Sequence, residues 1–188
     1  MTVRLDDLKA KYGEKIRVEW KSFMLRPTAQ GAKSRAEFVE YTRLWSRMPE
    51  TDTRLVVTSP WASDDPHPSH SVPALVAMKI VEAHGEVVAD DFHHRVFNAY
   101  FNENRTISDV GVLAAIAEEA GLDAGQFKTD FVAKQEAIEA QVIAEHNEAI
   151  QLGVSGVPFT VVDNQVAISG AQDTAVFVEV IDKMLADH

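Results

Sequence analysis

One stretch decides the fold predicted for this chain: Gly153-Val154-Ser155-Gly156-Val157-Pro158-Phe159-Thr160-Val161-Val162. It leads from a long helical pattern into a short apolar run. The turn Asp163-Asn164 then leads into a second run, Gln165-Val166-Ala167-Ile168. Two β-branched runs separated by an Asx pair predict a β-hairpin. Proline cannot donate to a strand ladder, so Pro158 belongs at the entrance of the first strand, and the bond before it is a candidate cis peptide.

The composition is that of one globular domain, or of one domain with a large insertion. The chain has 188 residues, of which 46% are hydrophobic and 25% charged, enough to bury a core. Its formal net charge of -11 argues against nucleic acid or an anionic membrane surface as a partner. The sequence shows neither an apolar run of membrane-spanning length nor a signal-peptide layout, so we expect a cytoplasmic protein.

The first third of the chain predicts a helix, a strand and a second helix. Helical spacing of apolar residues covers 2–12, and Gly13 ends it. Residues 16–25 alternate, with Ile16, Val18 and Trp20 on one face, which predicts a half-buried strand. Ser34 and Glu37 form a capping box for a helix over 34–48, and the proline-rich residues 49–70 are expected to be irregular.

The remainder predicts a helical block followed by the hairpin. Apolar periodicity, caps and glycine stops predict helices over about 71–85, 89–103 and 109–121, a short helix from Asp123, and another over about 133–152. A closing helix over about 173–186 follows the hairpin. A helical block between a strand-containing start and a ββα end is an α/β architecture with an α-helical subdomain.

These motifs resemble the DsbA-like thioredoxin-fold family, and most closely its FrnE-like branch. The similarity rests on Gly-Val-x-Gly-Val-Pro-Phe at 153–159, on Ile168-Ser169-Gly170-Ala171-Gln172, and on the closing helix. Residues 20–27, 92–101, 107–109 and 117–123 also match in kind. The resemblance implies a thioredoxin-like core formed by 1–33 and 153–188, with a mainly α-helical insertion over 34–152.

The resemblance implies a thiol-disulfide oxidoreductase or isomerase that acts on protein disulfides. In that family the valine–proline bond is cis, and the residue before the proline offers its backbone to an extended substrate. Gly156, Val157 and Pro158 are therefore the expected substrate-binding residues. The expected partner is an extended peptide or protein segment, and no cofactor is expected.

The chain departs from the family pattern because it contains no cysteine. The family's Cys-x-x-Cys lies at the start of the first helix, and Met1 falls inside that helix, so we expect the first strand and the redox motif to lie before residue 1. The strand at 16–25 would then lack its ladder partner. A homodimer, a strand-swapped dimer or a segment outside these residues would fill the gap.

Three interpretations follow. The favoured one is an oxidoreductase of the FrnE-like kind whose redox segment is missing from these residues. The second is a redox-inactive thioredoxin-fold module that binds peptides or a protein partner. The third is a relative of the glutathione-dependent isomerases and transferases that share this fold.

Other candidate sites are weaker. His67 and His70 lie in a loop near Asp64 and Asp65 without a second cluster, and adjacent His93 and His94 point to different faces of a helix, so no metal site is predicted. Ser155 lacks the glycine spacing of a nucleophile elbow. Four glutamates, Glu118, Glu119, Glu136 and Glu139, have the pattern of solvated helix faces, and Trp20, Trp45 and Trp61 that of packing residues. No catalytic residue is predicted.

Overall fold

The structure is a computed structural model that describes residues 2–29, 31, 34–43, 45, 57, 61 and 64–186. The chain divides into two compact units, each with its own core. Unit 1 is Met1–Phe23 with His146–His188, and unit 2 is Met24–Glu145. The boundary between Glu145 and His146 falls inside the long helix α7 (Ala124–Gln151).

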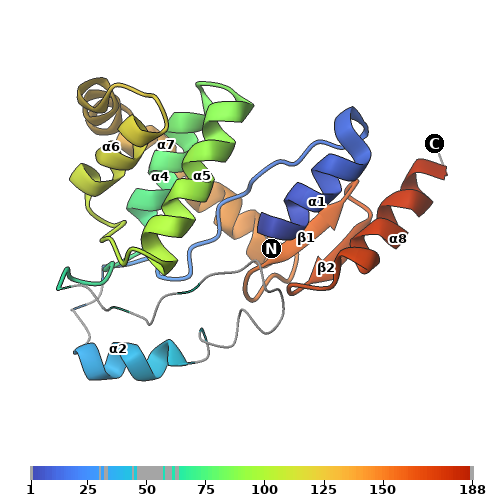
Figure 1. The fold of residues 1–188 in the computed structure, drawn as a ribbon, viewed down its shortest axis with the longest axis horizontal. Coiled ribbons are helices and arrows are strands. Elements are labelled where there is room, and N and C mark those ends of the chain that lie inside the picture. The colour runs from blue at the N-terminus through green and yellow to red at the C-terminus, as the bar shows by residue number, and fades with distance from the viewer. Residues whose placement is uncertain are drawn as a thin grey trace. The chain divides into compact units, whose positions relative to one another are not determined.

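Unit 1 combines a hairpin with two helices. It contains α1 (Thr2–Tyr12), the short 3-10 helix η1 (Gly13–Lys15), the strands β1 (Phe159–Val162) and β2 (Val166–Ser169), and α8 (Thr174–Ala186). Helices α1 and α8 pack against each other beside the hairpin (Figure 1). Their contact is apolar, and the buried residues of this core are Leu8, Tyr12, Ile168, Phe177 and Ile181.

The hairpin forms where the sequence predicts it. The two strands pair antiparallel, with Phe159 opposite Ser169 and Val162 opposite Val166. Asp163 and Asn164 both have positive φ, 50° and 54°, which is the backbone that a tight primed turn requires. The turn closes through the Gln165 N–H, which donates to the Val162 carbonyl at 3.0 Å. The second strand therefore begins at Val166, one residue later than predicted.

The predicted strand at 16–25 is wrong as secondary structure. The sheet of the described residues has only β1 and β2, and residues 16–24 form no ladder. The predicted alternation is nevertheless present, because Arg17, Glu19 and Lys21 are exposed while Ile16, Val18 and Trp20 are partly buried. The sequence therefore sets the two faces of this segment, but a strand also needs a paired neighbour.

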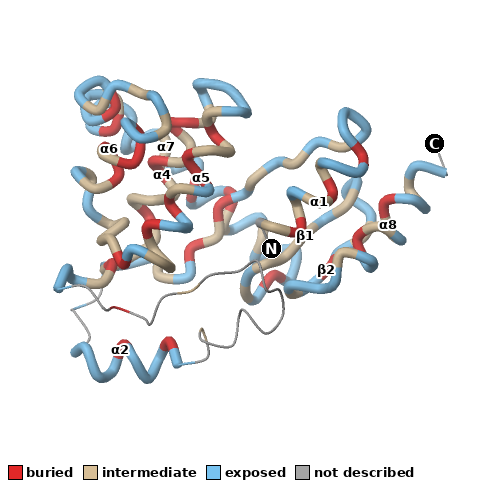
Figure 2. Tube along the Cα trace, viewed as in Figure 1, coloured by how far each residue is buried: buried red, intermediate tan, exposed pale blue. Residues whose placement is uncertain are grey.

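Unit 2 is helical. It contains α2 (Arg35–Tyr41), α4 (Val72–Glu82), α5 (Glu86–Phe101), α6 (Val110–Glu119) and α7 as far as Glu145. Helices α4, α5 and α6 pack on one another and turn their buried faces inward (Figure 2). Fully buried side chains of this core include Val76, Phe92, Leu113, Ile116 and Val142.

Local signals placed most helix starts correctly. Ser34 and Glu37 form the predicted capping box, and the Asp109 carboxylate accepts the Val112 N–H at 3.0 Å. The predicted break between a short helix from Asp123 and a helix at 133–152 is wrong, because α7 runs through it without a glycine or proline to interrupt it. Helix α2 ends at Tyr41, and most of the predicted 42–48 extension lies outside the described residues.

A buried ion pair lies in unit 2. The Lys79 ammonium lies 2.9 Å from Glu145 Oε1, and both side chains are less than a tenth exposed. Glu82 lies 3.2 Å from the same ammonium, and the Gln141 amide donates to Glu145 Oε1 at 3.1 Å. Within the described part of the chain, no helix combines the length and apolar character needed to cross a membrane.

Candidate functional site

The end of α7 sets the position of the loop that the sequence singled out. Gly153 has φ 82° and stops the helix, and its N–H donates to the Ile150 carbonyl at 3.0 Å. The Val154 N–H donates to the Ala149 carbonyl at 3.0 Å, and the Val154 side chain is buried. These two hydrogen bonds and the buried Val154 side chain fix the backbone at the start of the loop that follows.

Gly156, Val157 and Pro158 form an open loop in front of β1. The Val157–Pro158 peptide bond is cis, as the sequence suggested. The Val157 side chain is 51% exposed, and a Cβ added at Gly156 would meet no atom within 4 Å. In the described chain, the backbone N–H and C=O of Gly156 and Val157 enter no hydrogen bond. The loop thus presents unpaired backbone groups beside an exposed apolar side chain.

The C-terminal end of the loop, Pro158, is hydrogen-bonded to the hairpin. The Pro158 carbonyl accepts the Gly170 N–H at 2.9 Å, which extends the β1–β2 register by one pair. The Ser169 carbonyl accepts the Gln172 side-chain amide at 2.9 Å. The buried Arg4 guanidinium of α1 donates to the Ala171 carbonyl and lies 3.8 Å from Asp173. The loop is therefore joined to the residue after β2 through Pro158 and Gly170, and Arg4 of α1 holds the residues that follow.

A charged network of unit 1 joins α1 to α8. The Tyr12 hydroxyl donates to Asp182 Oδ1 at 2.6 Å, and the Lys11 ammonium lies 3.5 Å from Asp182 Oδ2. The hydrogen bond from Tyr12 lowers the pKa of Asp182 below its ordinary value, and Lys11 acts in the same direction. Burial raises the pKa of Tyr12, and its bond to Asp182 adds to that shift. These groups link two helices, and the loop 153–158 carries no titratable side chain.

The histidine candidates differ in their surroundings. The His67 ring lies 4.6 Å from the ring of Phe38, and His70 Nδ1 lies 2.8 Å from Ser69 Oγ. His93 is buried and stacks on Phe97 at 4.9 Å, whereas His94 is exposed. No group of three histidine, aspartate or glutamate side chains suited to a metal ion occurs among the described residues.

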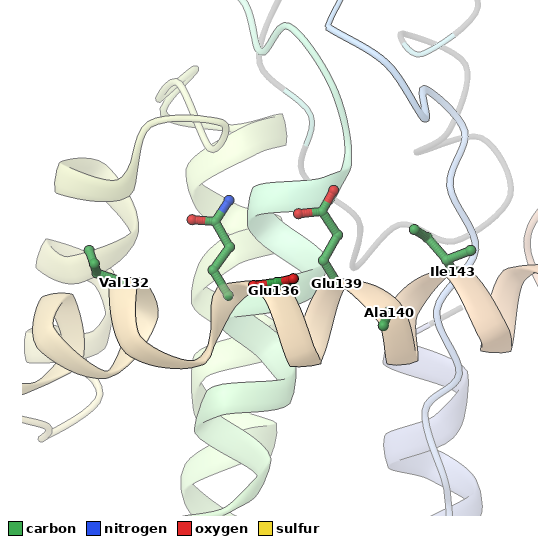
Figure 3. A pocket seen from close by; sticks show the side chains of 6 residues that line it. Val132, Glu136, Glu139, Ala140 and Ile143 are labelled. Carbon is green, nitrogen blue, oxygen red and sulfur yellow. The ribbon is translucent and has the colours of Figure 1, made fainter.

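Glu136 and Glu139 lie along one face of α7, beside a shallow hollow of about 500 Å³ (Figure 3). Its other lining residues are Val132, Gln135, Ala140 and Ile143. Val132 is 78% exposed, and Glu136 is exposed. The hollow is part of the surface of a single helix. Glu136 has the solvated position that its spacing predicts, whereas Glu139 is half-buried.

The sequence did not indicate an aromatic cluster in unit 2. Phe38 is fully buried and lies 5.3 Å from Trp61, and Trp61 lies 5.8 Å from Tyr100. The Arg26 guanidinium lies 5.2 Å from the ring centroid of Tyr41. Burial raises the pKa of Tyr100 to about 12. The aromatic residues are far apart in sequence, so only their frequency in α2 and α5 could have suggested the cluster.

A family model described as a DSBA-like thioredoxin domain matches residues 1–182 of this chain. The chain belongs to the DsbA-like thioredoxin family. This confirms the resemblance inferred from the loop at 153–159 and the thioredoxin-like fold with a helical insertion.

Individual relatives of this DsbA-like chain agree. The chain is 26% identical over 172 residues to YwbO, an uncharacterized protein of Bacillus subtilis, covering 90% of this chain and 82% of YwbO. A probable DsbA oxidoreductase from Streptomyces coelicolor has a similar structure, with a TM-score of 0.76 and 22% identity, over 98% of this chain and 83% of the other. A protein from Nitrosomonas europaea assigned as a protein disulfide isomerase gives a TM-score of 0.78 at 14% identity, over 100% and 90%.

The family is one of thiol-disulfide oxidoreductases, and this chain carries the family's fold without a cysteine. The described loop presents groups that are suited to recognition. Open backbone donors and acceptors at Gly156 and Val157 can pair with an extended polypeptide, and the Val157 side chain can contact an apolar group on it.

Proposed function

We propose that this DsbA-like chain serves the disulfide chemistry of its family by binding extended segments of protein substrates at Gly156, Val157 and Pro158. The observation that carries the proposal is the open backbone of this loop, which enters no hydrogen bond within the described chain. Main-chain pairing accepts many sequences, because it reads the backbone and not the side chain. A protein that acts on many substrates needs that tolerance.

The exchange step itself needs groups that these residues do not contain. Dithiol–disulfide exchange begins when a thiolate attacks a disulfide sulfur, and a second thiol then resolves the mixed disulfide. The 188 residues contain no thiol. The chain therefore contributes the binding part of the reaction, and the cysteines must be supplied from outside these residues.

A redox-inactive peptide-binding module is the second candidate, and the lack of cysteine favours it. Both candidate functions include the same binding step, so peptide binding supports both. They differ in disulfide exchange, which only the first is expected to show when cysteines are supplied from outside these residues. Glutathione, also an extended thiol peptide, is the third candidate ligand, and titration of reduced glutathione in the same assay tests it.

Binding is measured by following the backbone amides of the ¹⁵N-labelled chain during titration with a short peptide. The probe is an eight-residue peptide of three valine–threonine repeats between two lysines. We expect the amide signals of Gly156 and Val157 to shift in a saturable way. Shifts confined to α4, α5 or α6 would contradict the assignment of the site.

A matched pair of variants tests the contact with Val157. Val157→Asp places a charge against the apolar side chains of the peptide, so its affinity should fall at least fivefold, because a carboxylate is costly to desolvate. Val132→Asp introduces the same charge at a valine of unit 2 that is 78% exposed, and it should leave the affinity unchanged. Equal losses in both variants would indicate a general effect of charge.

An activity measurement tests the chemical half of the proposal. With dithiothreitol as reductant and a disulfide-linked model peptide as substrate, the chain alone should not raise the rate above background. Turnover with enzyme-like saturation would show that the chemistry resides in a group other than a thiol.

A further inference from the structure

Arg4 of α1 is buried in unit 1, although arginine side chains usually keep their charged end in water. The residue is 7% exposed and lies one helical turn before Leu8 of the apolar core. Its guanidinium donates to the Ala171 carbonyl, and the Asp173 carboxylate lies 3.8 Å away but is itself 88% exposed. An ion pair with so exposed a carboxylate is weak. The bond to Ala171 is therefore the main polar interaction that offsets the burial of this charge.

The link between β2 and α8, residues 170–173, is a tight turn. Gly170 has φ 79°, a backbone angle that favours glycine. The Gln172 N–H donates to the Gly170 carbonyl at 3.0 Å, and the Gln172 side-chain amide donates to the Ser169 carbonyl at 2.9 Å. These bonds close the link on itself. Arg4 adds a contact from a different element, and it ties the link to α1.

The same link also holds the loop 156–158. The Gly170 N–H donates to the Pro158 carbonyl at 2.9 Å. Proline has no N–H, so the carbonyl is the one backbone hydrogen-bonding group through which Pro158 can be held. The guanidinium of Arg4 is thus connected to the loop through two consecutive residues, Ala171 and Gly170.

Gly170 makes this connection dependent on a restraint. Glycine has more accessible backbone conformations than any other residue, so a link that begins with glycine is not fixed by its own sequence. A guanidinium is a planar group with donors in a fixed arrangement, and it holds a carbonyl in a defined direction. Arg4 supplies that restraint from the rigid backbone of α1.

We propose that Arg4 is a positioning residue for the loop 156–158. It holds Ala171, and through Gly170 it sets the position of the open backbone groups that pair with the substrate. The inference rests on the proposed function and deepens it, because it names a residue outside the loop on which binding depends. Loss of the guanidinium should weaken binding while the loop itself is unchanged in sequence.

Three variants test the positioning role, with the valine–threonine peptide as probe. Arg4→Met keeps an unbranched side chain but removes the donors, so the affinity should fall about tenfold because a charged hydrogen bond no longer restrains the link. Arg4→Lys keeps a charged donor and should bring the affinity to within about threefold of wild type. Asp173→Asn leaves the bond between Arg4 and Ala171 in place and should change the affinity less than about twofold.

Tyr12→Phe separates positioning from a general loss of stability. The Tyr12 hydroxyl also joins α1 to the C-terminal part of the chain, but it donates to Asp182 of α8 and not to the link. The variant should be less stable in urea and should bind the peptide within about twofold of wild type. If Tyr12→Phe and Arg4→Met both lose affinity in proportion to their stability, Arg4 has only a structural role and the proposal is wrong.

Amide hydrogen exchange in the free chain gives a readout that needs no peptide. Arg4→Met should speed exchange of the Gly170 amide at least about fivefold, because the link that carries this amide is no longer restrained. The Gln165 amide, which closes the hairpin turn on the Val162 carbonyl, should keep its wild-type rate. Equal acceleration at both amides would mean that the whole hairpin opens, which would contradict a local role.

The two proposals fail in different ways. Wild-type affinity in Arg4→Met, with the amide shifts of Gly156 and Val157 retained, would overturn the positioning role and leave the proposed function standing. Absence of peptide binding by the wild-type chain would contradict the proposed function, and with it the role of Arg4 in binding.

Discussion

At the scale of single residues, the Tyr12–Asp182 hydrogen bond makes unit 1 sensitive to acid. The folded-state pKa of Asp182 is lowered, so its contribution to stability is present above the unfolded pKa near 4 and is lost as the pH falls through the folded pKa. Tyr12→Phe should lower the free energy of unfolding at pH 7 by about 0.5–1 kcal/mol, the contribution of a partly solvated hydrogen bond. Urea unfolding at pH 7 and pH 3 measures both effects. Asp182→Asn is the control, because it keeps an acceptor oxygen but should remove the acid-dependent part.

A second prediction at this scale concerns the buried Lys79–Glu145 pair. Lys79→Met leaves the Glu145 and Glu82 carboxylates together without the ammonium, and removing one partner of a buried pair costs roughly 3–5 kcal/mol. Replacing both partners, Lys79→Met with Glu145→Leu, should recover much of that loss, because no buried charge is left unpaired by the change. A double-mutant cycle from urea unfolding measures the coupling. If the double variant is no more stable than Lys79→Met, the unpaired Glu145 carboxylate is not the cause of the lost stability.

At the scale of elements, α8 packs into the core of unit 1 through Phe177, its one aromatic side chain, together with Ile181. Phe177 is 1% exposed and packs with Leu8, Tyr12 and Ile168. Phe177→Ala should destabilise unit 1 by about 3–5 kcal/mol through lost burial and the cavity left behind. Val176→Ala, at a neighbouring position that is 39% exposed, should change stability by less than about 0.5 kcal/mol. Circular dichroism during urea unfolding compares the two variants, and equal effects would contradict the assigned core.

The elements also differ in how well the sequence predicts them. Elements specified by local chemistry were correct: the Ser34–Glu37 capping box, the Asp109 cap and the Asp163–Asn164 turn. Residues 16–25 were predicted as a strand because their alternation is real, but pairing depends on a distant segment. The loop at 156–158 could be anticipated because glycine allows backbone angles that other residues resist and proline fixes φ. The Lys79–Glu145 pair and the aromatic cluster join residues far apart in sequence, which periodicity does not reveal.

At the scale of the whole molecule, the two units differ in the size of their cores. Counted over the described residues, the main core of unit 2 contains seventeen buried apolar residues, and that of unit 1 contains five. Regions with few buried apolar contacts open at lower free energy than the global unfolding transition. We therefore expect the amides of β1, β2 and α8 to exchange with solvent faster than those of α4 and α6. Hydrogen exchange followed by mass spectrometry, with peptides assigned to each unit, measures the difference.

The denaturant dependence of that exchange decides whether unit 1 opens by itself. If it does, its amides should show an opening free energy below the global value and a smaller dependence on urea, since less surface is exposed. Phe177→Ala should then lower protection in β1, β2 and α8 and leave α4 and α6 nearly unchanged. Equal opening free energies in both units would mean that the chain unfolds in one step. Binding of the valine–threonine peptide should raise protection throughout unit 1, because a ligand that binds only the folded hairpin stabilises it by mass action.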